Sequence, residues 1–179
     1  MLYVTILDEI ADSSILINCS LPVHYPLQPE KERMTKSHDP PSFKTPHPLY
    51  ASYTTTPLSP TATLVTVSGQ VAEDPQTGET PPDLSAQVTL CLARLSACLD
   101  DAGAHKADIT RFMYYIAQRG IDQVDKIEGD GAALKLIGGK VGTWLEGHRP
   151  ASCYLRVFGM SEDRFLCEFE CMAIVANNN

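Results

Sequence analysis

The chain lacks both a long hydrophobic run and a cluster of basic residues. Its apolar stretches are shorter than the ~18–20 residues that a membrane-spanning helix needs. Its 14 Lys and Arg are outnumbered by 22 Asp and Glu, so the net charge is −8, and the basic residues form no run or stripe. An acidic surface of this kind repels phosphate backbones. We therefore expect a protein that binds neither a membrane nor a nucleic acid.

A secretory leader and metal-binding motifs are also missing. The first residues, MLYVTILDEIADSSILI, contain acidic side chains and no basic segment, which is atypical of a signal peptide and favours a cytoplasmic location. The histidines form no HxxxH or HExxH motif, so no metal is expected. The six cysteines form no CxxC pair and are interpreted as small buried apolar residues: Cys19, Cys91, Cys98, Cys153, Cys167 and Cys171.

Composition divides the chain near residue 48. Residues 20–48 are rich in proline and polar residues and show no periodicity, a composition that can bury little apolar surface. Residues 1–48 are therefore predicted to be an N-terminal extension, largely irregular or disordered, within which Met34 could serve as an alternative start. Residues 49–179 are predicted to form the compact domain.

Regular elements are expected in the second part. Residues 64–68 are typical of a buried strand, and the Pro- and Gly-rich loop that follows leads to Asp83, a suitable helix N-cap. Apolar residues then recur at three- and four-residue steps up to Gly103, which predicts an amphipathic helix. β-Branched, aromatic or alternating residues predict three further strands, over 108–118, 152–158 and 164–175.

Two other segments are predicted to contain loops. TTTPLSPTAT, at 54–63, is interpreted as a loop after an irregular opening strand. Residues 120–147 combine helical spacing with several glycines, which predicts a helix interrupted or preceded by a glycine-rich loop. Within it, GGKVGT at 138–143 lacks the spacing of a phosphate-binding loop and is interpreted as a flexible loop. The order β-α-β-α-β-β indicates an α+β domain with two helices packed on one face of a sheet.

The last predicted strand presents two carboxylates on one face. Glu168 and Glu170 alternate with cysteine and phenylalanine, so their side chains point to the same side. A solvated face of an antiparallel sheet would explain this pattern. A carboxylate pair that faces a pocket, where it positions a water or takes a proton, would explain it as well. The pattern by itself leaves both interpretations open.

Three segments resemble, in the right order, the Rid family (YjgF/RutC-like proteins, formerly grouped as L-PSP endoribonucleases). They are VSGQVAEDPQTGETPPDLSAQ, ACLDDAGAHKADITRFMYYI and RPASCYLRVFGMSEDRFLCEFECMAIV, within a similar region from about Leu49 to Val175. The resemblance implies a chorismate-mutase-like (YjgF-like) fold, a homotrimer, and a small-molecule substrate bound in a cleft between subunits. Family enzymes hydrolyse reactive enamines and imines derived from amino acids, without a metal or cofactor.

The resemblance also implies site residues. Glu168 matches the glutamate that orients the hydrolytic water, and Ser68 and Gly69 match a strand-end pair that contacts a ligand oxygen. Tyr50 matches the pocket tyrosine, with Tyr53 as an alternative.

At other positions the sequence departs from the family pattern. Asp125 stands in place of a pocket asparagine. Ser152, after Pro-Ala, stands where the P-A-R-S motif has an arginine that clamps substrate carboxylates. Losing a charge-assisted pair of this kind typically lowers affinity ~10–100-fold. Tyr154 could offer its backbone N–H, although its ring would reshape the cleft.

Three functions remain open. The first is a divergent family member that acts on a small reactive carbonyl or enamine compound of specialised metabolism, by hydrolysis, tautomerisation or cyclisation, with Glu168 as acid/base and Ser68 and Gly69 binding an oxygen. The second is the general family activity, deamination of 2-iminobutanoate or 2-iminopropanoate, with Arg149 or Arg156 turned into the cleft. The third is a non-catalytic small-molecule-binding or chaperone-like trimer.

Overall fold

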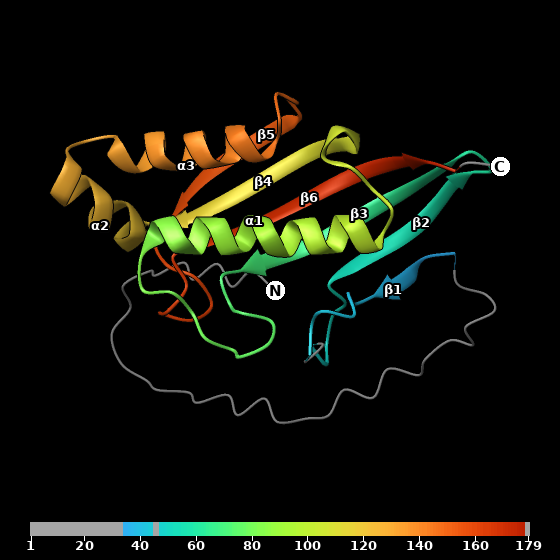
Figure 1. Ribbon diagram of the computed structural model, residues 1–179, viewed down its shortest axis with the longest axis horizontal. Coiled ribbons are helices and arrows are strands. Elements are labelled where there is room, and N and C mark those ends of the chain that lie inside the picture. Colours follow the sequence, from blue (N-terminus) through green and yellow to red (C-terminus); the bar gives the residue numbers. More distant parts are fainter. Residues whose placement is uncertain (1–33, 45–46, 178–179) are drawn as a thin grey trace, which may run out of the picture. The chain divides into compact units, whose positions relative to one another are not determined.

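A six-stranded sheet forms the centre of the described domain (Figure 1). The structure, a computed structural model, describes residues 34–44 and 47–177. The strands lie in the order β1-β2-β3-β6-β4-β5, and every neighbouring pair is antiparallel except β4–β5, which is parallel. The strands are β1 (Lys36–His38), β2 (Tyr53–Ser59), β3 (Ala62–Val71), β4 (Ile109–Ala117), β5 (Ala151–Val157) and β6 (Cys167–Ala176). The predicted α+β class is confirmed.

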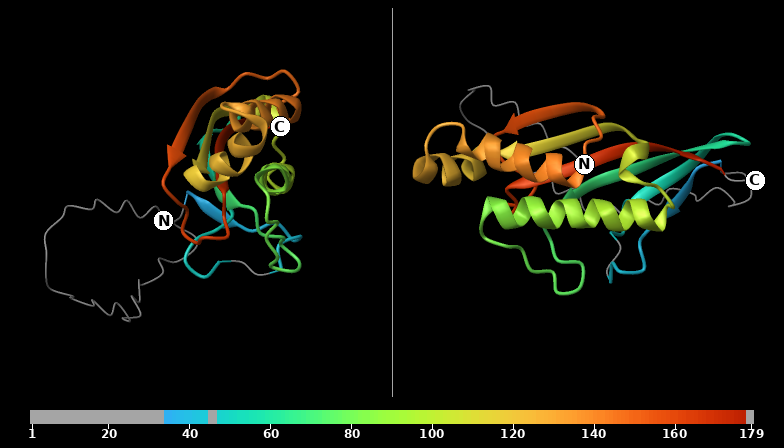
Figure 2. Two further views of the ribbon diagram at one scale, coloured as in Figure 1. Left: turned by 90° about the vertical axis from the view of Figure 1, so that its left-hand side faces the viewer. Right: turned by 45° about the horizontal axis from the view of Figure 1, so that its top comes forward.

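The helices cover one face of this sheet, and α1 crosses β3 and β6 (Figures 1 and 2). The helical elements are α1 (Leu84–Asp101), the 3₁₀ turn η2 (Lys106–Asp108), α2 (Gln118–Glu128) and α3 (Ala132–Trp144). Both predicted ends of α1 are confirmed. The backbone N–H of Ala86 donates to Asp83 Oδ1 over 2.8 Å, and Gly103 follows the helix with a φ of 67°, a conformation that favours glycine.

The core lies between α1 and the sheet. Phe112 and Phe169 are fully buried there, with ring centroids 5.8 Å apart in an edge-on arrangement. Four of the five described cysteines are also buried, as predicted: Cys91, Cys98, Cys167 and Cys171. Burial raises the pKa of Cys98 and of Cys171 to about 12, so these thiols remain protonated at neutral pH and pack as small apolar groups.

Two segments interpreted as loops are regular elements. Residues 54–63 form most of β2 and the start of β3, joined by a tight hairpin. GGKVGT at 138–143 lies inside α3 rather than in a flexible loop. Glycine lowers helix stability, but α3 packs Ala133, Ile137 and Val141 against the core, and burial of an apolar stripe outweighs propensity. The predicted glycine break is present, at Gly129–Gly131 between α2 and α3, so the segment contributes two helices and the domain three.

The sheet also begins earlier than residue 49. β1 pairs with β2, and Phe43 is 7% exposed and belongs to the core cluster. Part of the predicted extension 1–48 therefore belongs to the compact domain, and its first 33 residues lie outside the described residues. In the described part of the chain, no helix is long and apolar enough to cross a bilayer.

Candidate functional site

A β-bulge interrupts β3 at the predicted Ser-Gly pair. Between the register pairs Val67–Cys171 and Gln70–Phe169, β3 has one residue more than β6. The extra residue falls at 68–69, and a bulge of this kind kinks the strand and re-aims the neighbouring side chains. The strand thus changes direction where the sequence reads Ser-Gly.

The carboxylate of Glu168 lies directly against the backbone of Gly69. A Cβ atom at Gly69 would stand 1.8 Å from Glu168 Oε1 and 2.7 Å from its Cδ. Only glycine leaves room for the carboxylate in this position. Burial, with a further contribution from the charge of Glu170, raises the pKa of Glu168 above its ordinary value. The structure therefore brings Gly69 and Glu168 together, on the sheet face that α1 does not cover.

Two residues that the sequence interpretation missed share this face. Tyr115 is paired with Glu168, and its hydroxyl donates to Glu170 Oε1 over 3.3 Å. Cys153 is aligned with Met113 beside Glu170 and is the one described cysteine that is not fully buried. Alternation in DITRFMYYIAQ could have placed Tyr115 on one face of its strand, but the facing partner depends on the β4–β6 register.

Ser68 holds the segment that carries Tyr50. The Ser68 hydroxyl donates to the carbonyl of Ala51 over 2.7 Å, so in this arrangement it can accept, but not donate, a hydrogen bond from a ligand. Tyr50 is 50% exposed and stacks on His47 with ring centroids 3.8 Å apart. Burial and then the charge of Glu168 raise the Tyr50 pKa.

Tyr53 occupies a different environment. It is 2% exposed, and its hydroxyl donates to Asp101 Oδ2 over 2.8 Å. Burial and that hydrogen bond raise the pKa of Tyr53. Of the two tyrosines, Tyr50 is therefore the one available to a ligand.

Arg94, on α1, is a third residue that sequence interpretation missed. Its Nε donates to Gln70 Oε1 over 3.1 Å and its Nη1 to the carbonyl of Glu73 over 2.7 Å. The ring of Phe43 lies 4.3 Å from the guanidinium carbon. Within α1, Arg94 lies beside a buried stripe that is apolar apart from Gln87, and no spacing rule marks it as part of a site.

The β5 residues predicted to join Glu168 lie on the other face of the sheet. Tyr154 is paired with Tyr114, their rings are 5.4 Å apart, and Tyr114 packs on the buried Phe169. Ser152 and Arg156 share that face because they are two residues away along the strand. Within one chain, the structure therefore does not bring Ser152 or Tyr154 to Glu168. Ser152 is exposed, and its hydroxyl donates to the Pro150 carbonyl over 3.0 Å.

Asp125 caps a helix. Its Oδ1 accepts from the backbone N–H of Ala133 over 2.8 Å, and its Oδ2 accepts from that of Gly131 over 3.2 Å. Both carboxylate oxygens thus bind the first turn of α3, where backbone N–H groups lack partners within the helix. The structure shows Asp125 in this capping role, and its predicted contact with a substrate stays a prediction.

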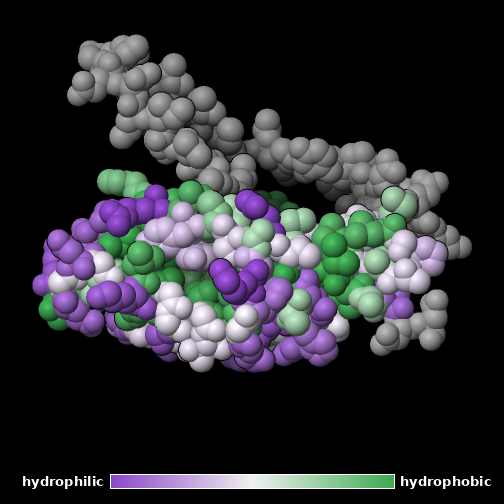
Figure 3. All heavy atoms as spheres, turned by 90° about the horizontal axis from the view of Figure 1, so that it is seen from above, coloured by the Kyte–Doolittle hydropathy of each residue, from purple (hydrophilic) through white to green (hydrophobic). Residues whose placement is uncertain are grey.

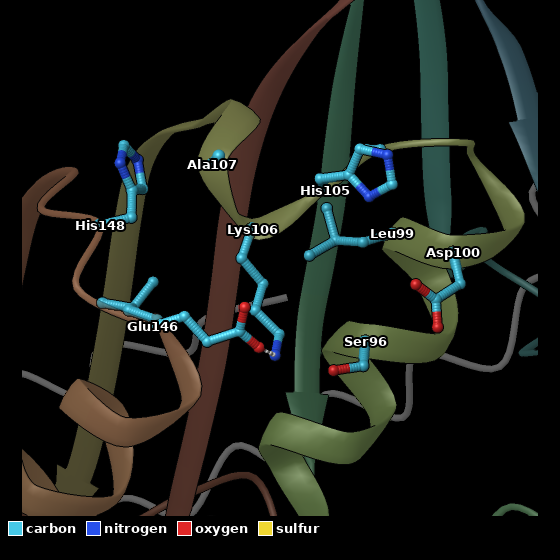
Figure 4. A pocket seen from close by; sticks show the side chains of 10 residues that line it. Ser96, Leu99, Asp100, His105, Lys106, Ala107, Glu146 and His148 are labelled. Atoms are coloured by element: carbon cyan, nitrogen blue, oxygen red, sulfur yellow. Dashed lines mark hydrogen bonds and ion pairs between the residues drawn. The ribbon is translucent and has the colours of Figure 1, made fainter.

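A separate hollow of about 460 Å³ lies where α1 ends, and it contains none of the predicted site residues (Figure 4). Lys106 Nζ meets Glu146 Oε1 across it at 2.5 Å. His148 Nε2 lies 2.7 Å from the Ile109 carbonyl. These contacts tie η2 and β4 to the segment after α3. Over the described ranges, no group of three His, Cys, Asp or Glu is arranged to hold a metal ion.

Comparison with known proteins gives a family and a fold. The family model described as endoribonuclease L-PSP matches residues 49–175. Comparison with curated sequences found no match.

Solved structures of similar fold include the Rid-family protein YyfA from Yersinia pestis (18% identity, TM-score 0.61, covering 78% of this chain and 98% of that one). The yeast protein YEO7 has 12% identity and a TM-score of 0.62, covering 79% and 98%. Escherichia coli TdcF, solved with bound serine, has 23% identity and a TM-score of 0.53, covering 70% and 87%.

Proposed function

The chain belongs to the endoribonuclease L-PSP family, also called the Rid/YjgF family, and from this premise we propose that it is an acid/base catalyst that acts on a small reactive carbonyl, imine or enamine compound. Glu168 is the proton acceptor and donor, and Tyr50, whose side chain is half exposed, is the tyrosine available to the substrate. The chemistry requires no group beyond these side chains and water.

One observation carries this proposal: the Glu168 carboxylate rests on the bare backbone of Gly69 at a bulge, with its pKa raised by burial. A carboxyl whose pKa is moved toward neutrality exchanges protons more readily in both directions at physiological pH. Because the bulge and the missing Cβ of Gly69 fix the position of the Glu168 carboxylate, this carboxylate is held in place before a substrate binds.

The reaction on an imine illustrates the role. Water adds to the carbon of the C=N bond while Glu168 accepts a proton from that water. Glu168 returns that proton to the nitrogen, which gives a carbinolamine. Glu168 then takes the proton of the carbinolamine hydroxyl and passes it to the amino group, so that the C=O bond forms, the C–N bond breaks and ammonia leaves a carbonyl product. For an enol or enamine, the same carboxyl would protonate the carbon or take a proton from the heteroatom.

Two assays test the proposal. Imines are generated in situ by an amino-acid oxidase and their lifetime is followed by trapping with semicarbazide, and the ketonisation of enol phenylpyruvate is followed by absorbance. We expect the wild type to accelerate at least one reaction and Glu168→Gln to lower that rate about 100-fold or more. Glu128→Gln, an exposed carboxylate at the end of α2, is the matched control. No acceleration by the wild type over buffer in either assay would leave the non-catalytic binding function in its place.

We also propose that the face carrying Glu168 packs against other copies of the chain in a homotrimer. No helix of the described residues covers this face, and two large apolar side chains on it, Leu155 and Ile174, are 39% and 42% exposed. Figure 3 looks onto a different side, the top of Figure 1 where α3 and β5 lie, and shows hydrophobic areas between hydrophilic ones there. Light scattering should give three times the mass of the 19.6 kDa chain, and Ile174→Glu should shift it toward the monomer.

Hydrolysis of RNA is the less favoured activity, although the family is named for it. A net charge of −8 opposes the approach of a phosphate backbone. We expect no retention of single-stranded RNA at moderate salt, and retention under those conditions would contradict this view.

A further inference from the structure

The proposed reaction leaves the second carboxylate on the helix-free face, Glu170, without a role. Glu170 follows Glu168 by two residues on β6, so the two side chains point to the same side with their Cα atoms about 7 Å apart. Two carboxylates at this separation repel each other when both are ionised. Such a pair therefore retains a proton more readily than an isolated carboxylate does.

Tyr115 lies beside both carboxylates. Across β4 and β6 it is the register partner of Glu168, and its hydroxyl donates to Glu170 Oε1 over 3.3 Å. The tyrosine side chain thus extends along the strands from the position of one glutamate to that of the other. Tyr115 is 9% exposed, and burial, followed by the charge of Glu170, raises its pKa. The phenol therefore keeps its proton at neutral pH and acts as the donor to Glu170.

The two carboxylates have different surroundings. Glu170 accepts the hydrogen bond of the phenol, which favours its ionised form. Glu168 is partly buried and lies against the bare backbone of Gly69, where desolvation favours its neutral form. When two acids of one site differ in this way, the proton that they share resides mainly on one of them. In this pair that acid is Glu168.

Other titratable or charged side chains reach this face from neighbouring elements. Arg111, on β4, is aligned with Met172 and is exposed, so water and salt screen its charge. Cys153 contributes a thiol from β5, and Tyr50 contributes a phenol from the segment before β2. Among the groups of this face, the carboxylate of Glu170 is an anion on the same strand as Glu168 and is held by a hydrogen bond. Its charge is therefore fixed in position relative to Glu168.

We propose that Tyr115 and Glu170 are positioning residues of the Glu168 site: the Tyr115 hydroxyl fixes Glu170 as a negative charge beside Glu168, and Glu168 is thereby the member of the pair that carries the exchangeable proton. This inference rests on the proposed function, since it names what regulates protonation of the same site. The charge of Glu170 also makes Glu168 a stronger base toward the proton of the attacking water.

Carbon-13 NMR of the full chain labelled at the glutamate carboxyl carbon tests the assignment by pH titration. The two signals are assigned by their loss in Glu168→Gln and in Glu170→Gln, and we expect Glu168 to be the last of the pair to lose its proton as the pH rises. Glu170→Gln removes the charge and keeps the shape, so the Glu168 midpoint should move to lower pH. Tyr115→Phe removes only the hydroxyl, which lets Glu170 take up the proton, so the midpoint should move the same way by a smaller amount. Tyr114→Phe, whose ring packs on Phe169 on the other face, should leave it unchanged.

The pH profile of the imine assay separates this role from a structural one. Glu168 must be ionised to accept a proton from water, so kcat rises with pH as Glu168 loses its proton. This acid limb should move to lower pH in Glu170→Gln and, by less, in Tyr115→Phe, while KM stays within about twofold of wild type. Substitution of a residue that only supports the fold would lower kcat at every pH and leave the limb in place.

Two results of the titration would overturn the assignment: an unchanged Glu168 midpoint in both Glu170→Gln and Tyr115→Phe, or a wild type in which Glu170 is the last to lose its proton. If Tyr115→Phe does not fold, the Glu168 midpoint in Glu170→Gln decides. Failure of the proposed function is recognised separately, because the titration requires no turnover. A wild type that accelerates neither reaction would remove the acid/base function, and the titration would still decide whether Tyr115 and Glu170 control the proton on Glu168.

Discussion

Successive residues of β6 occupy two different environments. Cys167, Phe169 and Cys171 face α1 and are at most 2% exposed. Glu168 and Glu170 face the other side, where the carboxylates contact a glycine backbone and a tyrosine hydroxyl. Both faces share one hydrogen-bonded ladder, so the backbone cannot account for the difference.

The two faces of β6 therefore differ in role: the face toward α1 stabilises the fold, and the opposite face is available for chemistry. Around Cys167, Phe169 and Cys171, apolar packing leaves no room for an ionised group. On the other face, the bulge at 68–69 creates one position where a carboxylate is partly desolvated and still accessible. Substitutions on the two faces should therefore affect different properties.

The largest effect is expected on the helix face. Phe169→Ala removes a ring that contacts Phe112 and Tyr114 at centroid distances of 5.8 Å. We expect a loss of about 3–5 kcal/mol in the free energy of unfolding, the usual result for a buried phenylalanine, measured by urea denaturation. Met172→Ala, on the opposite face of the same strand, is the control and should cost clearly less. Equal losses would mean that the two faces are equally packed.

The next effect is expected at Gly69. Gly69→Ala places a methyl group 1.8 Å from Glu168 Oε1, so the carboxylate must move, and a displacement of about 1 Å can cost about 100-fold in rate. We expect a loss of this size in the imine or enol assay, with a smaller effect on stability than that of Phe169→Ala. Gly142→Ala, where an added Cβ meets nothing within 4 Å, should leave the rate unchanged and stabilise α3 by up to about 1 kcal/mol. An unchanged rate in Gly69→Ala would show that the position of Glu168 does not matter.

Part of this fold could be predicted from interactions between residues that are neighbours in the sequence. Asp83 and Gly103 delimit α1 because capping and positive φ depend on neighbouring residues alone. The glycines of α3 were misinterpreted because its stability comes from packing of Ala133, Ile137 and Val141, a tertiary effect. The β2 hairpin was missed because a partly exposed strand of threonine, serine and proline lacks the apolar pattern of a buried one.

The candidate site was predictable only as separate residues. Glu168 and Gly69 were both found from sequence, but their contact depends on the β3–β6 register and on the bulge. Ser152 is predicted to line the same cleft between subunits; within one chain the β4–β5 register puts it on the other face, so its role stays a prediction. A shift of one residue exchanges the faces of a strand, and no pattern in the short segment 151–157 determines that shift.

A moderate effect is expected at Asp125, and it distinguishes a cap from a ligand contact. Because its oxygens accept from Ala133 and Gly131, Asp125→Ala should cost about 0.5–2 kcal/mol in the free energy of unfolding, as helix caps do. KM in the active assay should stay within about twofold of wild type, since an interaction absent from the substrate complex cannot alter it. Asp130→Ala, an exposed neighbour, is the control for stability. A raised KM with unchanged stability would instead favour the predicted contact with a substrate.

The smallest effect concerns the stability contribution of Glu168 itself. A carboxyl whose pKa is higher in the folded than in the unfolded state binds more protons when folded, so stability falls as the pH rises from its ordinary value of 4.5 through the raised value. Glu168→Gln removes this dependence. The variant should therefore melt above the wild type at pH 7, by at most about 3 °C, and the gain should shrink as the pH falls below 4.5, where both forms are neutral. The same pH series on Glu128→Gln, which changes an exposed carboxylate, should show no such pH-dependent gain in melting temperature.

A Glu168→Gln protein that melts below the wild type at pH 7 would mean that the Glu168 carboxylate is stabilised by its surroundings. The face opposite the helices would then be a solvated or ion-paired surface, and the difference between the two faces of β6 would be one of packing alone.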